Sequence, residues 1–102
     1  MFKIKANPTF KVPVEIARSD GETGTITFEF RHKTTDEAND FLQRAESLKP
    51  AEWAREIVVG WDGVEVAYSE DALAEVLQEH FAAAEAILKG YLKGLSGGKL
   101  GN

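Results

Sequence analysis

The sequence contains no cysteine, and its 102 residues include only two histidines, three prolines and one methionine. The absence of cysteine excludes disulfides, thiolate chemistry and cysteine-ligated zinc sites. No apolar run approaches the roughly 18 residues that a membrane span needs. The segment Met1–Lys5 also lacks the apolar stretch and cleavage site of a signal peptide. We therefore expect no membrane partner and a protein that stays where it is made.

Patterns that carry catalysis or metal binding are lacking as well. His32 and His80 lie far apart in the sequence, and neither stands in a HExxH-type motif. The segment 62–65 lacks the ligand spacing of a calcium loop. The segment 97–99, Gly-Gly-Lys, has no following Ser or Thr and so differs from a phosphate loop. We expect no catalytic residue, no metal ligand and no cofactor, and hence a protein that is not an enzyme.

The charged residues are distributed unevenly along the chain, whose net charge is −5. Residues 1–33 carry six basic and four acidic side chains, residues 34–88 carry three and thirteen, and residues 89–102 carry three and none. A phosphate backbone is bound by a coherent basic patch, so this distribution disfavours nucleic acid as a partner. Two interpretations remain open. The acidic middle is either a solvated helical surface or the complement of a basic hairpin in a neighbouring copy.

Two runs with apolar residues at alternate positions predict an N-terminal antiparallel β-hairpin. Their apolar positions are Phe10, Val12, Val14, Ile16, Ile26, Phe28 and Phe30. A turn cluster, Ser19–Gly24, separates the two runs. Pro13 cannot donate a ladder hydrogen bond, which predicts that the first run is an edge strand or a strand with an unpaired side. We expect a short third strand over Met1–Ala6.

From Thr34 onward the apolar period changes from 2 to 3.6, which predicts helices. Thr34 or Thr35 caps the first one, and Thr34 with Glu37 has the spacing of a capping box. Pro50 is expected to begin a second helix that stops at Gly60. Its apolar face would be formed by Trp53, Ala54, Ile57, Val58 and Trp61.

The last part of the chain reads as one or two further helices. Ser69 is a suitable N-cap after a brief alternation over Val64–Tyr68 that is too short to assign firmly as a strand. We expect a bend near His80-Phe81, with one continuous helix as the alternative. Gly90 and Gly94 leave bare backbone against which another element can pack closely.

The sequence thus predicts an α+β fold in which an N-terminal antiparallel hairpin packs on three to four helices. We expect a single domain over residues 1–95, with the hairpin at 8–33 and the helical part at 34–95. The Gly/Ser-rich segment 96–102 is expected to be a flexible tail.

Several short motifs follow one another in a specific order between about Pro8 and Leu95. They are Asn7-Pro8-Thr9-Phe10, Phe28-x-Phe30-Arg31-His32, Thr35-x-Glu37, Val59-Gly60-Trp61-Asp62-Gly63, Ser69-Glu70-Asp71-Ala72-Leu73 and Ile87-x-x-x-Tyr91. In this order and spacing they resemble the tail assembly chaperones of long-tailed bacteriophages and prophages. The sequence departs from that family after His80-Phe81, where a proline often follows.

The resemblance implies a non-enzymatic protein that forms homo-oligomers, binds the tape measure protein and helps recruit major tail tube subunits. It further implies action in the host cytoplasm, absence from the mature virion and, in many members, a longer form made by ribosomal frameshifting. The candidate family-motif or interface residues are Phe28, Phe30, Arg31, His32, Glu37, Gly60, Trp61, Asp62 and Tyr91. A structural minor tail protein retained in the virion, or an acidic regulatory protein, remain the alternatives.

Overall fold

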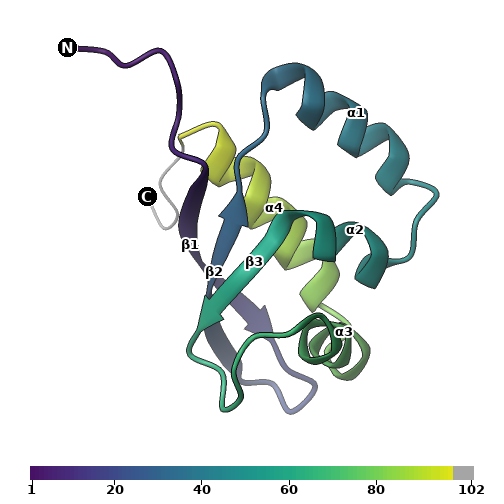
Figure 1. Ribbon diagram of the computed structural model, residues 1–102. Coiled ribbons are helices and arrows are strands. Elements are labelled where there is room, and N and C mark those ends of the chain that lie inside the picture. The colour runs from purple at the N-terminus through teal and green to yellow at the C-terminus, as the bar shows by residue number, and fades with distance from the viewer. Residues whose placement is uncertain (98–102) are drawn as a thin grey trace.

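The computed structural model describes residues 1–97, which form a three-stranded antiparallel sheet and four helices (Figure 1). The elements are β1 (Thr9–Ala17), β2 (Thr23–Arg31), α1 (Thr35–Ala45), α2 (Pro50–Ile57), β3 (Val58–Asp62), α3 (Glu70–Glu79) and α4 (Ala83–Leu95). The predicted α+β fold with an N-terminal hairpin is confirmed. Most of the expected tail, including Gly98-Lys99, lies outside the described residues.

The hairpin of β1 and β2 has a regular register in which Phe10 faces Phe30 and Val12 faces Phe28. Alternate side chains of both strands therefore point to one side of the sheet and are buried there. Gly21 has a φ of +89° in the connecting turn, a backbone conformation that glycine adopts without steric cost. The strand order β1-β2-β3 leaves β1 at an edge, as Pro13 predicted.

The expectation of a long second helix is wrong, because α2 ends at Ile57 and the chain continues as β3. β3 pairs antiparallel with β2, with Glu29 opposite Gly60 and a β-bulge between Glu29 and Phe30. Pairing with β3 satisfies backbone groups of β2 that a helix in this place would leave without partners. The predicted helical part, 34–95, therefore contains a strand.

The two tryptophans consequently do not share a helical face. Trp53 lies on α2 and packs edge-on against Phe41, with ring centroids 6.4 Å apart. Trp61 lies on β3 and packs edge-on against Phe28, at 6.3 Å.

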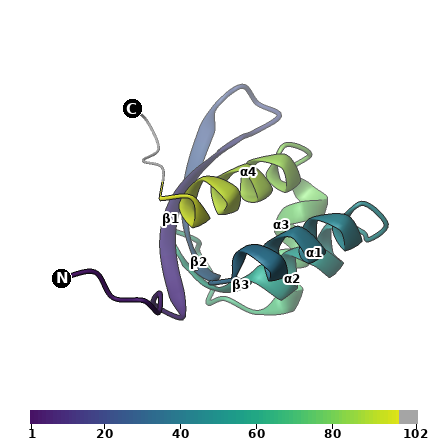
Figure 2. The same ribbon diagram turned by 90° about the horizontal axis from the view of Figure 1, so that it is seen from above.

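The expectation of a short N-terminal strand also fails. The segment Met1–Ala6 forms no strand and extends away from the body of the protein (Figures 1 and 2). Residues 64–68 form bends and irregular backbone after Gly63, whose φ is +91°.

The predicted helix boundaries agree with the structure where a capping residue defines them. Thr34, not Thr35, caps α1, and the reciprocal bonds of a capping box are formed with Glu37. Pro50 is the first residue of α2, and the Ser69 hydroxyl accepts a hydrogen bond from the N–H of Ala72 at the start of α3. The bend near His80-Phe81 is confirmed, since α3 ends at Glu79 and α4 begins at Ala83.

The helices cover one face of the sheet (Figure 2), and α4 lies directly against β1. Glycine makes this close approach possible, because a Cβ on Gly90 would lie 2.8 Å from Cγ2 of Val14. A Cβ on Gly94 would lie 2.5 Å from a ring carbon of Phe10. The buried core between the sheet and the helices comprises Val12, Val14, Ile16, Phe28, Phe30, Phe41, Trp53, Ala54, Ile57, Val58, Leu73, Ala83, Ile87 and Tyr91.

Candidate functional site

Three of the family-motif residues lie in the centre of the core. Phe28, Phe30 and Tyr91 have no exposed surface. The rings of Phe30 and Tyr91 lie 5.1 Å apart, and Phe28 stacks on Phe30 at 5.7 Å. The Tyr91 hydroxyl donates to the carbonyl of Arg31, and burial raises the pKa of Tyr91 well above its usual range. In this structure, these side chains join α4 to the sheet.

A charged cluster lies where β2 leads into α1. Glu56 at the end of α2 accepts two hydrogen bonds from the Arg44 guanidinium, at 2.8 and 2.9 Å, and forms a 2.8 Å ion pair with Lys33. The Arg44 hydrogen bonds are the main cause that lowers the pKa of Glu56 to about 2. Arg31 donates through Nε to the backbone carbonyl of Glu56, at 3.3 Å. The cluster thus holds α1, α2 and the end of β2 together.

The helix-start motif residues have a structural role in the same region. The Glu37 carboxylate accepts a hydrogen bond from the N–H of Thr34 at 2.9 Å, and this bond is the main cause that lowers the pKa of Glu37. The backbone N–H of His32 donates to the carbonyl of Pro8 at 2.9 Å, just beyond the two strands. Both contacts fix the path of the chain from β2 into α1.

The remaining motif residues, Gly60, Trp61 and Asp62, are brought together on β3. Gly60 lies opposite Glu29 in the sheet. A Cβ added at Gly60 would therefore lie only 3.3 Å from Oε1 of Glu29. The Trp61 indole N–H donates to the carbonyl of Val66 at 3.0 Å, which ties the segment after β3 to the strand. Asp62 pairs with Lys11 across the sheet at 3.8 Å, on the face away from the helices. The motif therefore spans the buried and the exposed side of β3.

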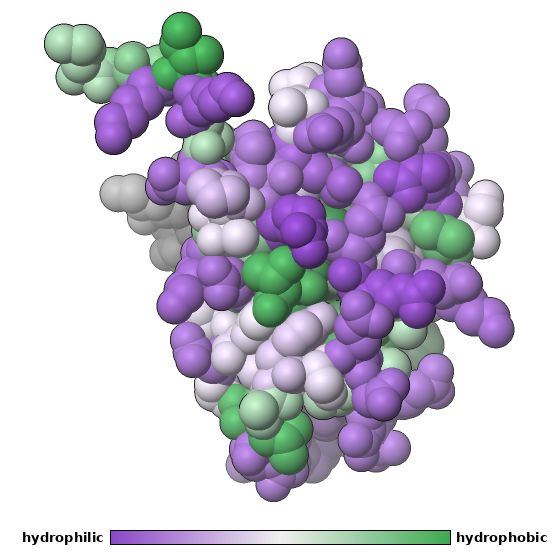
Figure 3. All heavy atoms as spheres, viewed as in Figure 1, coloured by the Kyte–Doolittle hydropathy of each residue, from purple (hydrophilic) through white to green (hydrophobic). Residues whose placement is uncertain are grey.

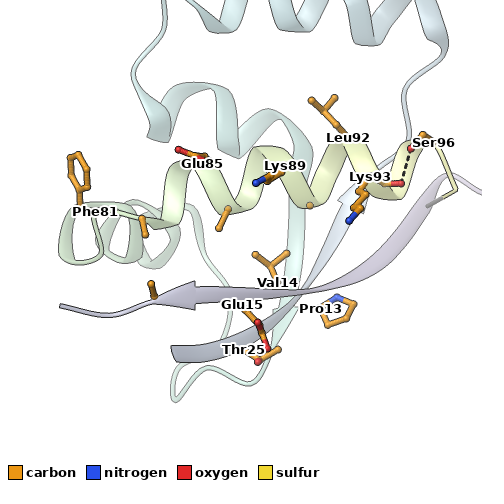
Figure 4. Close-up of a pocket in the computed structure, with 14 residues that line it drawn as sticks. Pro13, Val14, Glu15, Thr25, Phe81, Glu85, Lys89, Leu92, Lys93 and Ser96 are labelled. Carbon is orange, nitrogen blue, oxygen red and sulfur yellow. Dashed lines mark hydrogen bonds between the residues drawn. The ribbon is translucent and has the colours of Figure 1, made fainter. Parts of the chain in front are cut away.

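A groove runs between α4 and the outer edge of β1 (Figure 4). Its apolar lining includes Val14, Ala86 and Leu92, and Glu15 and Lys89 stand along it. No local sequence pattern predicts this groove, because it is formed by segments about 70 positions apart in the chain.

Phe81 stands at one end of the groove, at the corner between α3 and α4, and its ring points away from the strands (Figure 4). It is fully exposed, as are Phe2 and Ile4 in the N-terminal segment. The green side chains of that segment stand clear of the body of the protein in Figure 3. The sequence alone did not indicate this exposure, because Phe81 lies four residues after Leu77 and so continues the apolar spacing of the preceding helix.

Within residues 1–97, no group of three or more His, Asp or Glu side chains is arranged to hold a metal ion. Over the same residues, no buried side-chain nitrogen or oxygen lacks a hydrogen-bond partner. None of the helices described is both long enough and apolar enough to cross a membrane.

The family of this chain is decided by a match to a protein-family model. The family model described as phage tail assembly chaperone matches residues 1–102, the whole chain. The chain belongs to the phage tail assembly chaperone family. No curated protein matches the chain. No solved structure matches it either.

Proposed function

We propose that this phage tail assembly chaperone acts without catalysis, by self-association and by binding the tape measure protein while tail tube subunits are recruited. The observation that supports this function best is the almost complete exposure of large apolar side chains at two separate places. These are the N-terminal segment, with Met1, Phe2 and Ile4, and the helical corner, with Phe81. Apolar side chains that the fold leaves in water are available to bind another protein.

We assign Phe81 to the tape measure protein. Burying a phenylalanine side chain contributes about 1.5–3 kcal/mol, which the fold itself does not gain from Phe81. Backbone hydrogen bonds from His80 to Val76 and from Ala83 to His80 fix the corner, so little backbone freedom is lost when Phe81 binds a partner.

The chemistry around Phe81 indicates what kind of surface it fits. Glu79 precedes it and Glu85 follows it, and both are exposed. The complementary partner surface is an apolar pocket with lysine or arginine at its rim, because opposite charges favour association and like charges suppress it.

The assignment is tested by coexpressing the chaperone with the tape measure protein of the same phage and measuring their co-purification. Phe81→Ser should lower capture of the tape measure protein at least tenfold while leaving the thermal midpoint unchanged, because the ring makes no contribution to the core. Val66→Ser is the matched control, since it removes another exposed apolar side chain, and it should bind like the wild type. Equal capture by Phe81→Ser and the wild type would contradict the assignment.

Departure from the finished tail is tested separately. Mass spectrometry of purified virions should detect tail tube and tape measure proteins but not this chain. A stoichiometric amount of the chain in virions would instead support the alternative, a minor tail protein that remains in the particle.

A further inference from the structure

We propose that copies of this protein join through strand addition, in which residues 2–5 of one copy pair with the open edge of β1 in the next. The inference rests on the self-association proposed above and names the surfaces that carry it. The partner is a second copy of this chain, and the site is the half of β1 from Pro13 to Ala17 together with the groove beside α4.

The N-terminal segment has the pattern of a strand but pairs with no strand of residues 1–97. Phe2 and Ile4 alternate with Lys3 and Lys5, which is the period of an extended strand with one apolar face. Phe2 and Ile4 are fully exposed. A strand added to a sheet would bury them and would pair the backbone groups of the segment.

The two edges of the sheet differ in how accessible they are. At the β3 edge, the Tyr68 hydroxyl donates to the carbonyl of Val58, at 3.1 Å, and the Trp61 indole bonds to Val66. The segment that follows β3 thus folds back along its own strand. No comparable contact of the described residues covers β1, so β1 is the edge available to a partner.

The register shows which groups of β1 face outward. Two backbone hydrogen bonds, from His32 to Pro8 and from Arg18 to Glu22, lie just beyond the two ends of the β1–β2 ladder and continue its register. Pro8 and Arg18 both have even residue numbers, so the even positions of β1 are the ones whose backbone groups bond to β2. In an antiparallel pair, such positions alternate with positions whose backbone points away from the partner. The N–H and C=O groups of Glu15 and Ala17 therefore face the open side. Pro13 also faces outward but has no N–H to offer.

Side-chain chemistry then selects the second half of β1. Neighbouring strands place opposite residues on the same face of the sheet. A segment with Lys3 opposite Glu15 would put Phe2 and Ile4 on the helix side, over the groove lined by Ala86 and Leu92. In the first half of β1, the outward-facing position between Thr9 and Pro13 is Lys11, which would repel Lys3.

The segment of the same chain cannot reach this site. It leaves β1 at Thr9, the end opposite to Glu15 and Ala17. If it folded back through the tightest two-residue turn, at Asn7-Pro8, Phe2 would lie opposite Pro13, and a longer turn would reach less far. Strand addition must therefore come from another copy. Because donor and acceptor surfaces differ, such contacts are head-to-tail and can propagate into a filament or ring.

Sedimentation velocity of the 102-residue chain over a range of concentrations tests the inference. Replacing both Phe2 and Ile4 with serine should raise the dissociation constant for self-association at least tenfold. Glu15→Lys should have a similar effect, and adding Lys3→Glu to Glu15→Lys should restore association. Glu46→Lys is the matched control, because it makes the same charge change at an exposed position after α1, and it should associate like the wild type.

The outcomes separate this inference from the proposed function. Undiminished oligomers in the Phe2/Ile4 variant, or no restoration by the charge exchange, would overturn strand addition while self-association itself stands. A wild-type protein that stays monomeric at every concentration would overturn both. Capture of the tape measure protein reports independently on the chaperone function, because the variants of Phe2, Ile4, Lys3 and Glu15 still carry Phe81.

A second readout locates the contact on β1. Ala17→Pro removes an outward-facing N–H without changing charge, and proline is tolerated at an unpaired edge position. This variant should keep the thermal midpoint near that of the wild type and lose association. Unchanged association would overturn the assignment of the Pro13–Ala17 half as the acceptor.

Discussion

The hydroxyl of Tyr91 in α4 donates a 2.9 Å hydrogen bond to the backbone carbonyl of Arg31 at the end of β2. The two residues stand 60 positions apart in the chain. The bond therefore ties the last helix to the point where the hairpin ends and the helical part begins. The charged cluster begins directly after this point in the chain, with Lys33, which pairs with Glu56 as Arg44 does. Core packing and ion pairs therefore meet at one junction.

Tyr91→Phe should destabilise the protein by about 1 kcal/mol, the usual net value of a hydrogen bond whose removal keeps the packing intact. This loss corresponds to a fall in thermal midpoint of roughly 4 °C for a chain of this length. Thermal unfolding followed by circular dichroism measures it. An unchanged midpoint would show that the hydroxyl contributes nothing to stability.

Phe30→Ala should cost about 3–5 kcal/mol, because the side chain is completely buried and its removal leaves a cavity. Phe81→Ala is the control, since that ring is fully exposed, and it should stay within about 0.5 kcal/mol of the wild type. Urea unfolding of both variants gives the free energies. A loss below 1 kcal/mol for Phe30→Ala would remove this residue from the core.

Glu56 should make stability depend on pH at the acidic end. Its folded pKa of about 2 lies below the ordinary value of 4.5, so the unfolded chain takes up the proton first as the pH falls. The stabilisation is complete above about pH 5 and is lost progressively toward pH 2. Part of the Arg44 and Glu56 side chains is exposed, so we expect about 1 kcal/mol at neutral pH.

The variant Glu56→Gln checks this dependence. Its thermal midpoint should lie below that of the wild type at pH 7, and the difference should shrink as the pH approaches 2. A difference that stays constant over this range would mean that the charge of Glu56 is not the cause.

Gly90→Ala should destabilise the protein by about 1–3 kcal/mol, because the new Cβ would lie 2.8 Å from Val14 in a tightly packed contact. This sign is opposite to that of an ordinary helix position, where alanine is preferred over glycine. Gly24→Ala is the control, since nothing lies within 4 Å of the added Cβ. Stabilisation by Gly90→Ala would show that α4 does not need the close approach to β1.

Deletion of residues 98–102 should leave the thermal midpoint within about 1 °C of the wild type. For comparison, a loss of 1 kcal/mol in the free energy of unfolding would lower the midpoint by roughly 4 °C. Among the described residues, the C-terminal end of α4 is closed by hydrogen bonds from the Ser96 hydroxyl to the carbonyl of Lys93 and from the N–H of Gly97 to the carbonyl of Gly94. Differential scanning calorimetry of the shortened chain measures the effect. A marked fall in the midpoint would mean that the segment docks on the fold.

Local sequence signals determined the hairpin and most helix boundaries. Alternating apolar residues fixed which side chains of β1 and β2 are buried. The N-caps Thr34 and Ser69 and the first helical residue Pro50 each lie at a predicted helix start. These features depend on interactions within a few positions of the chain. Interactions of that range are visible in the sequence itself.

Only the tertiary structure decided that Val58–Asp62 is a strand. Val58 and Trp61 also fit helical spacing, so the pattern alone did not separate the two states. The deciding factor is the edge of β2, whose backbone groups need a partner at Gly60 and Asp62. The groove beside α4 was likewise unpredictable, because it arises from segments far apart in the chain. Its position depends on which surfaces the folded core leaves uncovered, and no local pattern records that.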